Sequence, residues 1–209
     1  MPPPLPVPAA EQPVAPRRVG LLFGSFNPVH TGHLILAEHF ATQTDLAEVW
    51  LVVSPHSPFK QAQDLLPEAQ RLELVQLAIA GNPRLRAEEV EFSLPRPSYS
   101  SVTLAALRQR HPNLDFVLLM GADNLTDVRR WHDADRLLAA TDIYVYPRPG
   151  AVLPDLRLFP RVRVLAAPVL DISASFIRER LRAGHSIRYL VPEAVERRIR
   201  QAGYWAAQP

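Results

Sequence analysis

The 209-residue chain has no cysteine, and only one of its 23 basic residues, Lys60, is a lysine. The absence of cysteine excludes a disulfide scaffold, a zinc site built on thiolates and catalysis by a cysteine nucleophile. No apolar run approaches the roughly 20 residues that span a bilayer, and no basic start followed by a continuous apolar stretch marks a signal peptide. We therefore expect a cytoplasmic protein that does not bind membranes.

Hydrophobic residues make up 47% of the chain and charged residues 21%, a balance that excludes disorder of the whole chain and suits one folded domain. The first sixteen residues hold seven of the 22 prolines, which lack an amide donor and have a fixed φ. We expect a disordered, proline-rich tail over residues 1–17 and a single domain over residues 18–209.

Short apolar runs alternate with stretches of helical periodicity after the tail. Because these runs are continuously apolar, they are typical of parallel strands covered on both faces. The sequence thus predicts a doubly wound α/β domain with a parallel sheet, whose ligands lie at the carboxyl ends of the strands. The expected strands are 19–23, 49–53, 84–92, 116–120, 143–146 and 162–165, and the expected helices are 34–40, 72–79, 100–110, 173–183 and 192–202.

The segment Gly24-Ser25-Phe26-Asn27-Pro28-Val29-His30-Thr31-Gly32-His33 follows the first expected strand. A glycine there lets backbone amides approach a ligand, and the next helix offers free N–H groups to an anion. His30 and His33 are three residues apart and share one side of a helix, where each can donate to a phosphate oxygen. Zinc binding is the weaker alternative, since no H-E-x-x-H pattern and no thiolate accompany them, and simple packing is weaker still.

The segment Ile172-Ser173-Ala174-Ser175-Phe176-Ile177-Arg178 opens another expected helix. Ser173 suits an N-cap, and taken alone the segment is a capped helix with an exposed arginine. Two hydroxyls and a guanidinium at this spacing also make a phosphate clamp. The clamp is favoured only because the first motif accompanies it.

Positive charge gathers toward the C-terminus, where residues 155–200 carry ten arginines and five acids. Such an imbalance indicates a compact anionic ligand rather than the pervasive basic surface of a nucleic-acid-binding protein. From charge alone, a solvated, arginine-rich helix face is the favoured interpretation.

Together the two motifs resemble the nucleotidyltransferase superfamily of HxGH and ISxSxxR proteins and, within it, the bacterial nicotinate-nucleotide adenylyltransferases. The resemblance runs from about Arg18 to Tyr204. The chain departs from it at Asn27, where many members have aspartate, and in a shortened loop at 54–60 that leaves the role of His56 open. Supporting segments in family order are Ser-Pro-His-Ser-Pro-Phe-Lys at 54–60, Pro-Ser-Tyr-Ser at 97–100, Met-Gly-Ala-Asp-Asn-Leu at 120–125, Trp131 and Pro-Arg-Pro-Gly at 147–150.

This resemblance implies a Rossmann-like fold and adenylyl transfer from ATP to nicotinate mononucleotide, giving deamido-NAD and pyrophosphate. No protein nucleophile is needed, because the phosphate of the mononucleotide attacks the α-phosphorus. The alternatives are an adenylyltransferase for nicotinamide mononucleotide or phosphopantetheine, a fragment of a class I aminoacyl-tRNA synthetase, and a nucleotide-binding module without catalysis. A homo-oligomer stays open.

The resemblance also implies the site residues. His30, His33 and Arg178 would hold the ATP phosphates as catalytic residues, and Asp123 would accept from a ribose hydroxyl, although a simple turn residue is a serious rival. A magnesium ion would accompany ATP, held mainly by substrate oxygens and water, with no dedicated protein ligand. The remaining ATP and phosphate contacts would come from Gly24, Ser25, Phe26, Lys60, Ser173 and Ser175.

For the acceptor, the resemblance implies that backbone amides around Tyr99 and Ser100 meet the nicotinate carboxylate and that Trp131 stacks on the pyridine ring. Amides that face a carboxylate favour the acid over the amide form of the substrate. A core tyrosine and a surface-anchoring tryptophan are the structural alternatives.

Overall fold

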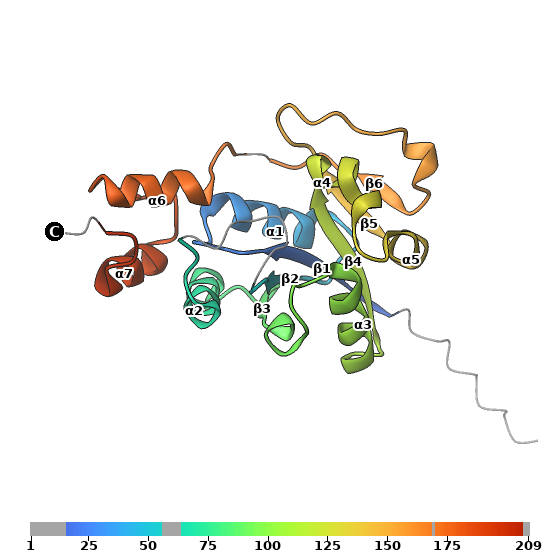
Figure 1. Ribbon diagram of the computed structural model, residues 1–209, viewed down its shortest axis with the longest axis horizontal. Coiled ribbons are helices and arrows are strands. Elements are labelled where there is room, and N and C mark those ends of the chain that lie inside the picture. The colour runs from blue at the N-terminus through green and yellow to red at the C-terminus, as the bar shows by residue number, and fades with distance from the viewer. Residues whose placement is uncertain (1–15, 56–63, 169, 207–209) are drawn as a thin grey trace, which may run out of the picture.

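The sheet of the computed structural model is parallel throughout, with strand order β3-β2-β1-β4-β5-β6 (Figure 1). The structure describes residues 16–55, 64–168 and 170–206, and these form six strands. The chain leaves β1 in one direction toward β3 and then returns to place β4 on the other side of β1, so a topological switch point lies between β1 and β4. The strands are β1 (Arg17–Gly24), β2 (Glu48–Val53), β3 (Leu85–Glu88), β4 (Leu114–Gly121), β5 (Ile143–Tyr146) and β6 (Val162–Val164).

Helices cover both faces of the sheet, and alternate residues of each strand enter one of two cores. In β4, Val117 and Leu119 join the core under α1 (Thr31–Gln43), while Phe116 and Leu118 join the core under α3 (Ser100–Arg110). The first core is completed by α2 (Glu68–Ile79), α6 (Ala174–Arg182) and α7 (Glu193–Ala202), with α6 and α7 at the left end of Figure 1. The second core includes α4 (Ala122–Asp127), α5 (Ala134–Ala140) and the 3-10 turns η1 (Val90–Ser93) and η2 (Val128–Arg130), and a third turn, η3, spans Leu156–Leu158.

The predicted doubly wound α/β fold is confirmed, and the differences lie at the ends of elements. The expected strand at 84–92 is shorter, because the chain turns into η1 after Glu88. Two short helices, α4 and α5, were missed, since six and seven residues are too few to display a helical period. Strand β1 begins at Arg17, one residue inside the predicted tail, and the rest of that tail except Pro16 lies outside the described residues.

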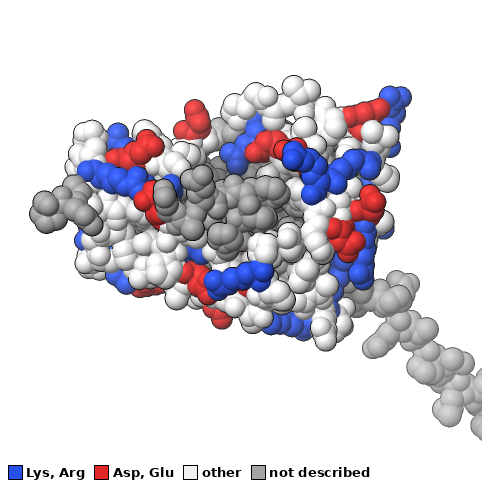
Figure 2. All heavy atoms as spheres, viewed as in Figure 1, with Lys and Arg blue, Asp and Glu red and all other residues white. Residues whose placement is uncertain are grey.

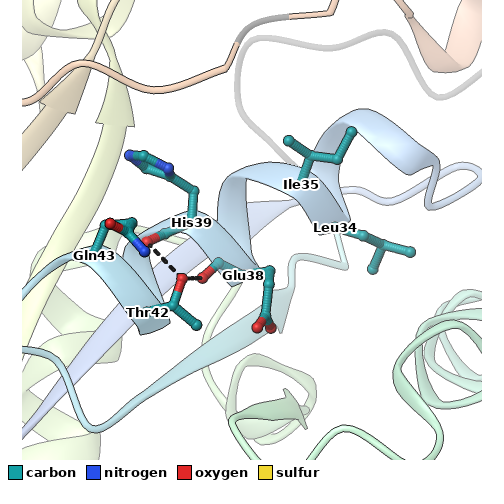
Figure 3. Close-up of a pocket in the computed structure, with 6 residues that line it drawn as sticks. All are labelled: Leu34, Ile35, Glu38, His39, Thr42 and Gln43. Atoms are coloured by element: carbon teal, nitrogen blue, oxygen red, sulfur yellow. Dashed lines mark hydrogen bonds between the residues drawn. The ribbon is translucent and has the colours of Figure 1, made fainter.

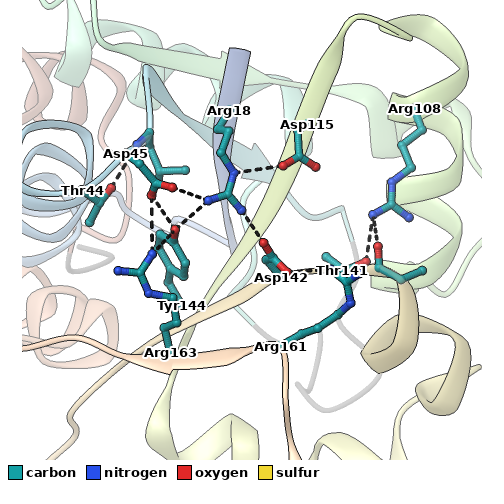
Figure 4. Close-up of polar contacts among 12 residues, drawn as sticks. Arg18, Thr44, Asp45, Arg108, Asp115, Thr141, Asp142, Tyr144, Arg161 and Arg163 are labelled. Atoms are coloured by element: carbon teal, nitrogen blue, oxygen red, sulfur yellow. Dashed lines mark hydrogen bonds and ion pairs between the residues drawn. The ribbon is translucent and has the colours of Figure 1, made fainter. Parts of the chain in front are cut away.

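Arg18 lies on β1 at the end of the sheet opposite the carboxyl edges, where it joins several elements (Figure 4). Its Nε donates to Asp115 of β4 at 2.9 Å, and one terminal nitrogen donates to the hydroxyl of Tyr144 in β5 at 2.9 Å. It also pairs with Asp45 and Asp142. Arg18 therefore neutralises carboxylates of the scaffold at the end of the sheet opposite the carboxyl edges.

Of the described helices, none combines the length and the apolar character needed to cross a membrane.

Candidate active site

A cleft of about 580 Å³ opens at the carboxyl ends of β1, β4 and β5, where the switch point lies. It is lined by turns that follow these strands and by the start of α6. The cleft lies at the edge of the sheet where the sequence predicted a ligand site. Nine of the predicted residues line it: Gly24, Ser25, Phe26, His30, His33, Asp123, Ser173, Ser175 and Arg178.

The turn after β1 is shaped by a close contact between Gly24 and Phe26. Phe26 has φ of 45° and folds its buried ring back, so that a Cβ at Gly24 would lie 2.9 Å from ring atoms. The same ring meets His33 edge-on, with centroids 5.0 Å apart. The sequence predicted only a backbone role for Phe26, whereas its side chain also supports the imidazole of His33.

His30 and His33 stand at the N-terminus of α1 with stacked rings, their centroids 3.6 Å apart. The main-chain N–H of His30 donates to Nδ1 of His33 at 3.2 Å. A ring that accepts at Nδ1 is neutral and carries its proton on Nε2, so His33 is set as a donor at that atom. No group of three or more histidine, cysteine, aspartate or glutamate side chains that could hold a metal occurs within the described residues.

His30 is only 6% exposed, and its environment disfavours a charged ring. Burial and, secondarily, the positive charge of Arg148 lower the pKa of His30 from 6.5 to about 4. Its Nδ1 is buried without a hydrogen-bond partner in the described part of the chain. Gly32 makes room for this ring, because a Cβ there would lie 3.2 Å from Nδ1. At neutral pH, His30 therefore presents a neutral imidazole to the cleft.

Arg178 projects from the first turns of α6 toward the turn after β1. One terminal nitrogen, Nη1, donates to the main-chain oxygen of Asn27 at 2.9 Å, and Nη2 donates to Oγ of Ser175 at 3.2 Å. Its Nε is buried and has no acceptor among the described residues. Ser173 caps α6, as predicted, by accepting from the N–H of Phe176 at 3.1 Å. Burial lowers the pKa of Arg178, yet an arginine so placed remains a cation at neutral pH.

Arg148 follows β5 and lines the cleft, although the sequence assigned it no role. It lies 3.8 Å from the carboxylate of Asp123 and above the ring of Tyr146, 5.5 Å from its centroid. A Cβ at Gly121 would be 2.3 Å from Asp123 and 3.0 Å from Arg148, so only glycine leaves space for both. The available signal was its position within Pro-Arg-Pro-Gly, directly after an expected strand.

The residues predicted to choose the acceptor lie outside the cleft as the described residues define it. Tyr99 is the N-cap of α3, Ser100 is its first residue, and Trp131 is half-buried against the same core as α3. The ring of Tyr99 stacks on His132 at 4.4 Å between centroids, which brings the segment of Trp131 beside the start of α3. The sequence missed His132, which has no motif around it.

Lys60 and His56 lie outside the described residues, so the predicted phosphate contact of Lys60 stays a prediction.

A second, open hollow lies on the outer face of α1, lined by residues such as Leu34 and His39, and it contains none of the predicted site residues (Figure 3). On the face shown in Figure 2, basic and acidic side chains are interspersed. In the arginine-rich C-terminal part, Arg178 is therefore a better indicator of an anionic ligand than the total charge is.

The chain is similar to known proteins in sequence and in fold. A family model described as cytidylyltransferase-like matches residues 21–180. The "probable nicotinate-nucleotide adenylyltransferase" of Cytophaga hutchinsonii is 47% identical over 189 residues, covering 90% of this chain and 98% of its own. The protein of the same name from Bacteroides fragilis is 46% identical over 188 residues, covering 90% of this chain and 94% of its own.

Among solved structures, the nicotinic acid mononucleotide adenylyltransferase of Plasmodium falciparum, complexed with NaAD, shares the fold. Its TM-score is 0.75 at 17% identity, over 90% of this chain and 97% of that one. The two bacterial relatives, in contrast, are 47% and 46% identical to this chain over 98% and 94% of their own length. The chain therefore belongs to the nicotinate-nucleotide adenylyltransferase family of enzymes, within the cytidylyltransferase-like group.

Proposed function

We propose that this protein transfers the adenylyl group of ATP to nicotinate mononucleotide, giving nicotinate adenine dinucleotide and pyrophosphate. One observation carries the proposal: His30, His33 and Arg178 converge on a single cleft at the N-terminus of α1. Its relatives, named above, carry this activity in their names. We expect the reaction to take place in the cytoplasm.

In the proposed reaction, a phosphate oxygen of nicotinate mononucleotide attacks the α-phosphorus of ATP. The bond from this phosphorus to the bridging oxygen of the β-phosphate breaks, and pyrophosphate leaves with that electron pair. No side chain forms a covalent bond. The protein accelerates the step by aligning two anions and by stabilising the charge that develops on the leaving group.

Two buried nitrogens support a phosphate ligand in this position. Nδ1 of His30 and Nε of Arg178 belong to residues that line the cleft, and neither has a hydrogen-bond partner among the described residues. Buried polar atoms are nearly always paired, so such atoms in a cleft indicate where a ligand completes the bonding. In the proposal, Arg178 and Nε2 of His33 donate to phosphate oxygens, and Ser173 and Ser175 bind the β- and γ-phosphates.

Asp123 is the one carboxylate among the described residues that line the cleft, and we propose that it accepts from a ribose hydroxyl. A single carboxylate is too few for a protein-built magnesium cage, but it suits an ion held mainly by substrate phosphates and water. Such an ion would neutralise charge on the phosphate chain. The backbone amides of Gly24, Ser25 and Phe26 complete the proposed phosphate site.

For the acceptor, we propose that the nicotinate carboxylate binds at the start of α3, with Trp131 against the pyridine ring. Tyr99 supplies no side-chain cap to this helix within the described chain, so the first amides of α3 remain available to an anion. A carboxylate gains from the positive end of the helix dipole, and a neutral carboxamide gains less. The site therefore favours nicotinate over nicotinamide mononucleotide.

The test is turnover of purified protein with magnesium-ATP and each of three acceptors: nicotinate mononucleotide, nicotinamide mononucleotide and phosphopantetheine. We expect the highest kcat/KM with nicotinate mononucleotide and the release of pyrophosphate in equal amount to the dinucleotide. A higher kcat/KM with either of the other acceptors would overturn the assignment. The His33→Ala variant serves as the control for contaminating activity.

A further inference from the structure

Asn27 lies in the turn between β1 and α1 and is only 5% exposed. Both ends of its side-chain amide bond to the backbone of the segment that precedes α2. Nδ2 donates to the main-chain oxygen of Asp64 at 2.9 Å, and Oδ1 accepts from the N–H of Leu66 at 3.1 Å. This pair of bonds needs one donor and one acceptor on the same side chain, which an amide provides and a carboxylate does not. Family members with aspartate at this position cannot make the same pair, so the pair belongs to the turn of this chain.

The main chain of the same residue holds the guanidinium of Arg178. Nη1 of Arg178 donates to the carbonyl oxygen of Asn27 at 2.9 Å, so α6 is joined to the turn at this atom. Nη2 of Arg178 bonds to its own helix through Ser175 at 3.2 Å. Within the described residues, the carbonyl of Asn27 is thus the hydrogen-bond acceptor that ties Arg178 to the turn before His30 and His33.

Arg71 of α2 joins the same two segments through hydrogen bonds to their main-chain oxygens. It is 1% exposed and donates to the main-chain oxygens of Ser25 at 2.6 Å and of Leu66 at 2.9 Å. The N–H of Leu66 donates to Asn27 and the main-chain oxygen of Leu66 accepts from Arg71, so both side chains fix the backbone of this residue. Burial lowers the pKa of Arg71 to about 10, which still leaves the guanidinium charged at neutral pH.

We propose that Asn27 is a positioning residue, whose side-chain amide fixes the backbone carbonyl that holds Arg178 and thereby sets Arg178 relative to the histidine pair. It touches no reacting atom and acts through Arg178. The inference rests on the proposed function, because it assigns Arg178 to the phosphates of ATP. It predicts that disturbing a neutral amide in this turn impairs the use of ATP more than the use of nicotinate mononucleotide.

The experiment compares Asn27→Asp with a matched variant, Asn82→Asp. Asn82 lies three residues after the last residue of α2. Asn82 also uses both ends of its amide: Nδ2 donates to the side-chain carboxylate of Glu38 at 2.7 Å, and Oδ1 accepts from the N–H of Arg84 at 3.0 Å. In each variant, a carboxylate oxygen replaces the donor and faces another oxygen. Asn82 is not part of the cleft, so its variant reports the cost to stability alone.

We expect Asn27→Asp to lower kcat by about 10- to 100-fold, the scale of a misplaced catalytic group, and to raise KM for ATP. KM for nicotinate mononucleotide should stay within about twofold, as should all kinetic constants of Asn82→Asp. Wild-type kinetics in Asn27→Asp, or an equal loss in both variants at equal loss of melting temperature, would overturn the proposal.

A double-mutant cycle keeps the proposal testable if Asn27→Asp fails to fold. Asn27→Ala removes both bonds without adding a charge, and we expect its effect on kcat to disappear in an Arg178→Ala background. Additive losses would show that Asn27 acts independently of Arg178. If wild-type protein does not turn over nicotinate mononucleotide, the proposed function fails by itself. Calorimetric binding of ATP then decides the inference: the Asn27→Asp variant must bind ATP more weakly than wild type, and unchanged binding would overturn it.

Discussion

The imidazole rings of His30 and His33 lie one above the other, 3.6 Å apart and inclined by 25°. Two protonated rings at this distance would repel each other strongly. The structure avoids this, because His30 is buried beside Arg148 and His33 accepts a bond at Nδ1. The pair therefore lines the cleft as neutral rings, and Arg178 and Arg148 bring the positive charge to it.

Replacing His33 or Arg178 with alanine should reduce kcat with nicotinate mononucleotide by at least about 100-fold while leaving the fold intact. Both side chains line the cleft, where in the proposed function each donates a hydrogen bond to a phosphate oxygen of ATP. Steady-state kinetics measure the loss, and circular dichroism checks the fold. A variant with near-normal turnover would remove that residue from the mechanism.

The buried His30 makes stability depend on pH. Its pKa is about 4 in the folded protein and 6.5 in its ordinary state, so the unfolded chain binds more protons between these values. The free energy of unfolding is therefore highest above pH 6.5 as far as His30 is concerned. It falls by about 3 kcal/mol between there and pH 4, because the unfolded chain takes up a proton at this ring and the folded protein does not. Denaturant unfolding of wild type and His30→Gln at several pH values tests this, and a variant with the wild-type pH dependence would contradict it.

Arg148→Met should raise the pKa of His30. Removal of a nearby cation favours the imidazolium form, although burial, the larger cause of the low value, remains. The ring carbon protons of His30, followed by NMR across pH 3–8, measure the change. The distant Arg157→Met variant is the control, because Arg157 is fully exposed and pairs only with Asp155 in the described contacts. A value that stays at about 4 in Arg148→Met would exclude the charge of Arg148 as a cause.

Gly32→Ala should lower kcat by about tenfold with little change in melting temperature. The new Cβ would lie 3.2 Å from Nδ1 and 3.3 Å from Cε1 of His30, so the ring must move by a few tenths of an ångström. If the effect acts only through this ring, Gly32→Ala should cost nothing further in a His30→Asn background. Kinetics of both single variants and the double variant decide between these outcomes.

Local sequence patterns were sufficient for most elements of the fold. A continuous apolar run such as Phe116–Met120 has few alternatives to a buried parallel strand, and Ser100–Arg110 was expected with the bounds that the structure shows. The two motifs that line the cleft, residues 24–33 and 172–178, could also be found locally, because each consists of neighbouring residues at a strand end or a helix start. Asp123 and the histidine pair line one cleft, which lies at the carboxyl ends of the strands, where the fold class predicted a site.

Contacts between distant segments could not be read from the chain. Arg148 and Asp123 meet because β5 lies beside β4, and Asn27 meets Asp64, Leu66 and Arg178 because the ends of β1, α2 and α6 converge. His132 lies on Tyr99, 33 residues away, with no motif around it.

The amino-acid sequence by itself determined the parallel sheet, the two motifs that line the cleft and the family, because periodicity and short-range spacing are local properties. Only the tertiary structure decided that His30 is neutral, that Phe26 supports His33 and that Asn27 joins the turn to Arg178. Burial and hydrogen-bond geometry depend on which segments pack together, and that packing belongs to the whole chain.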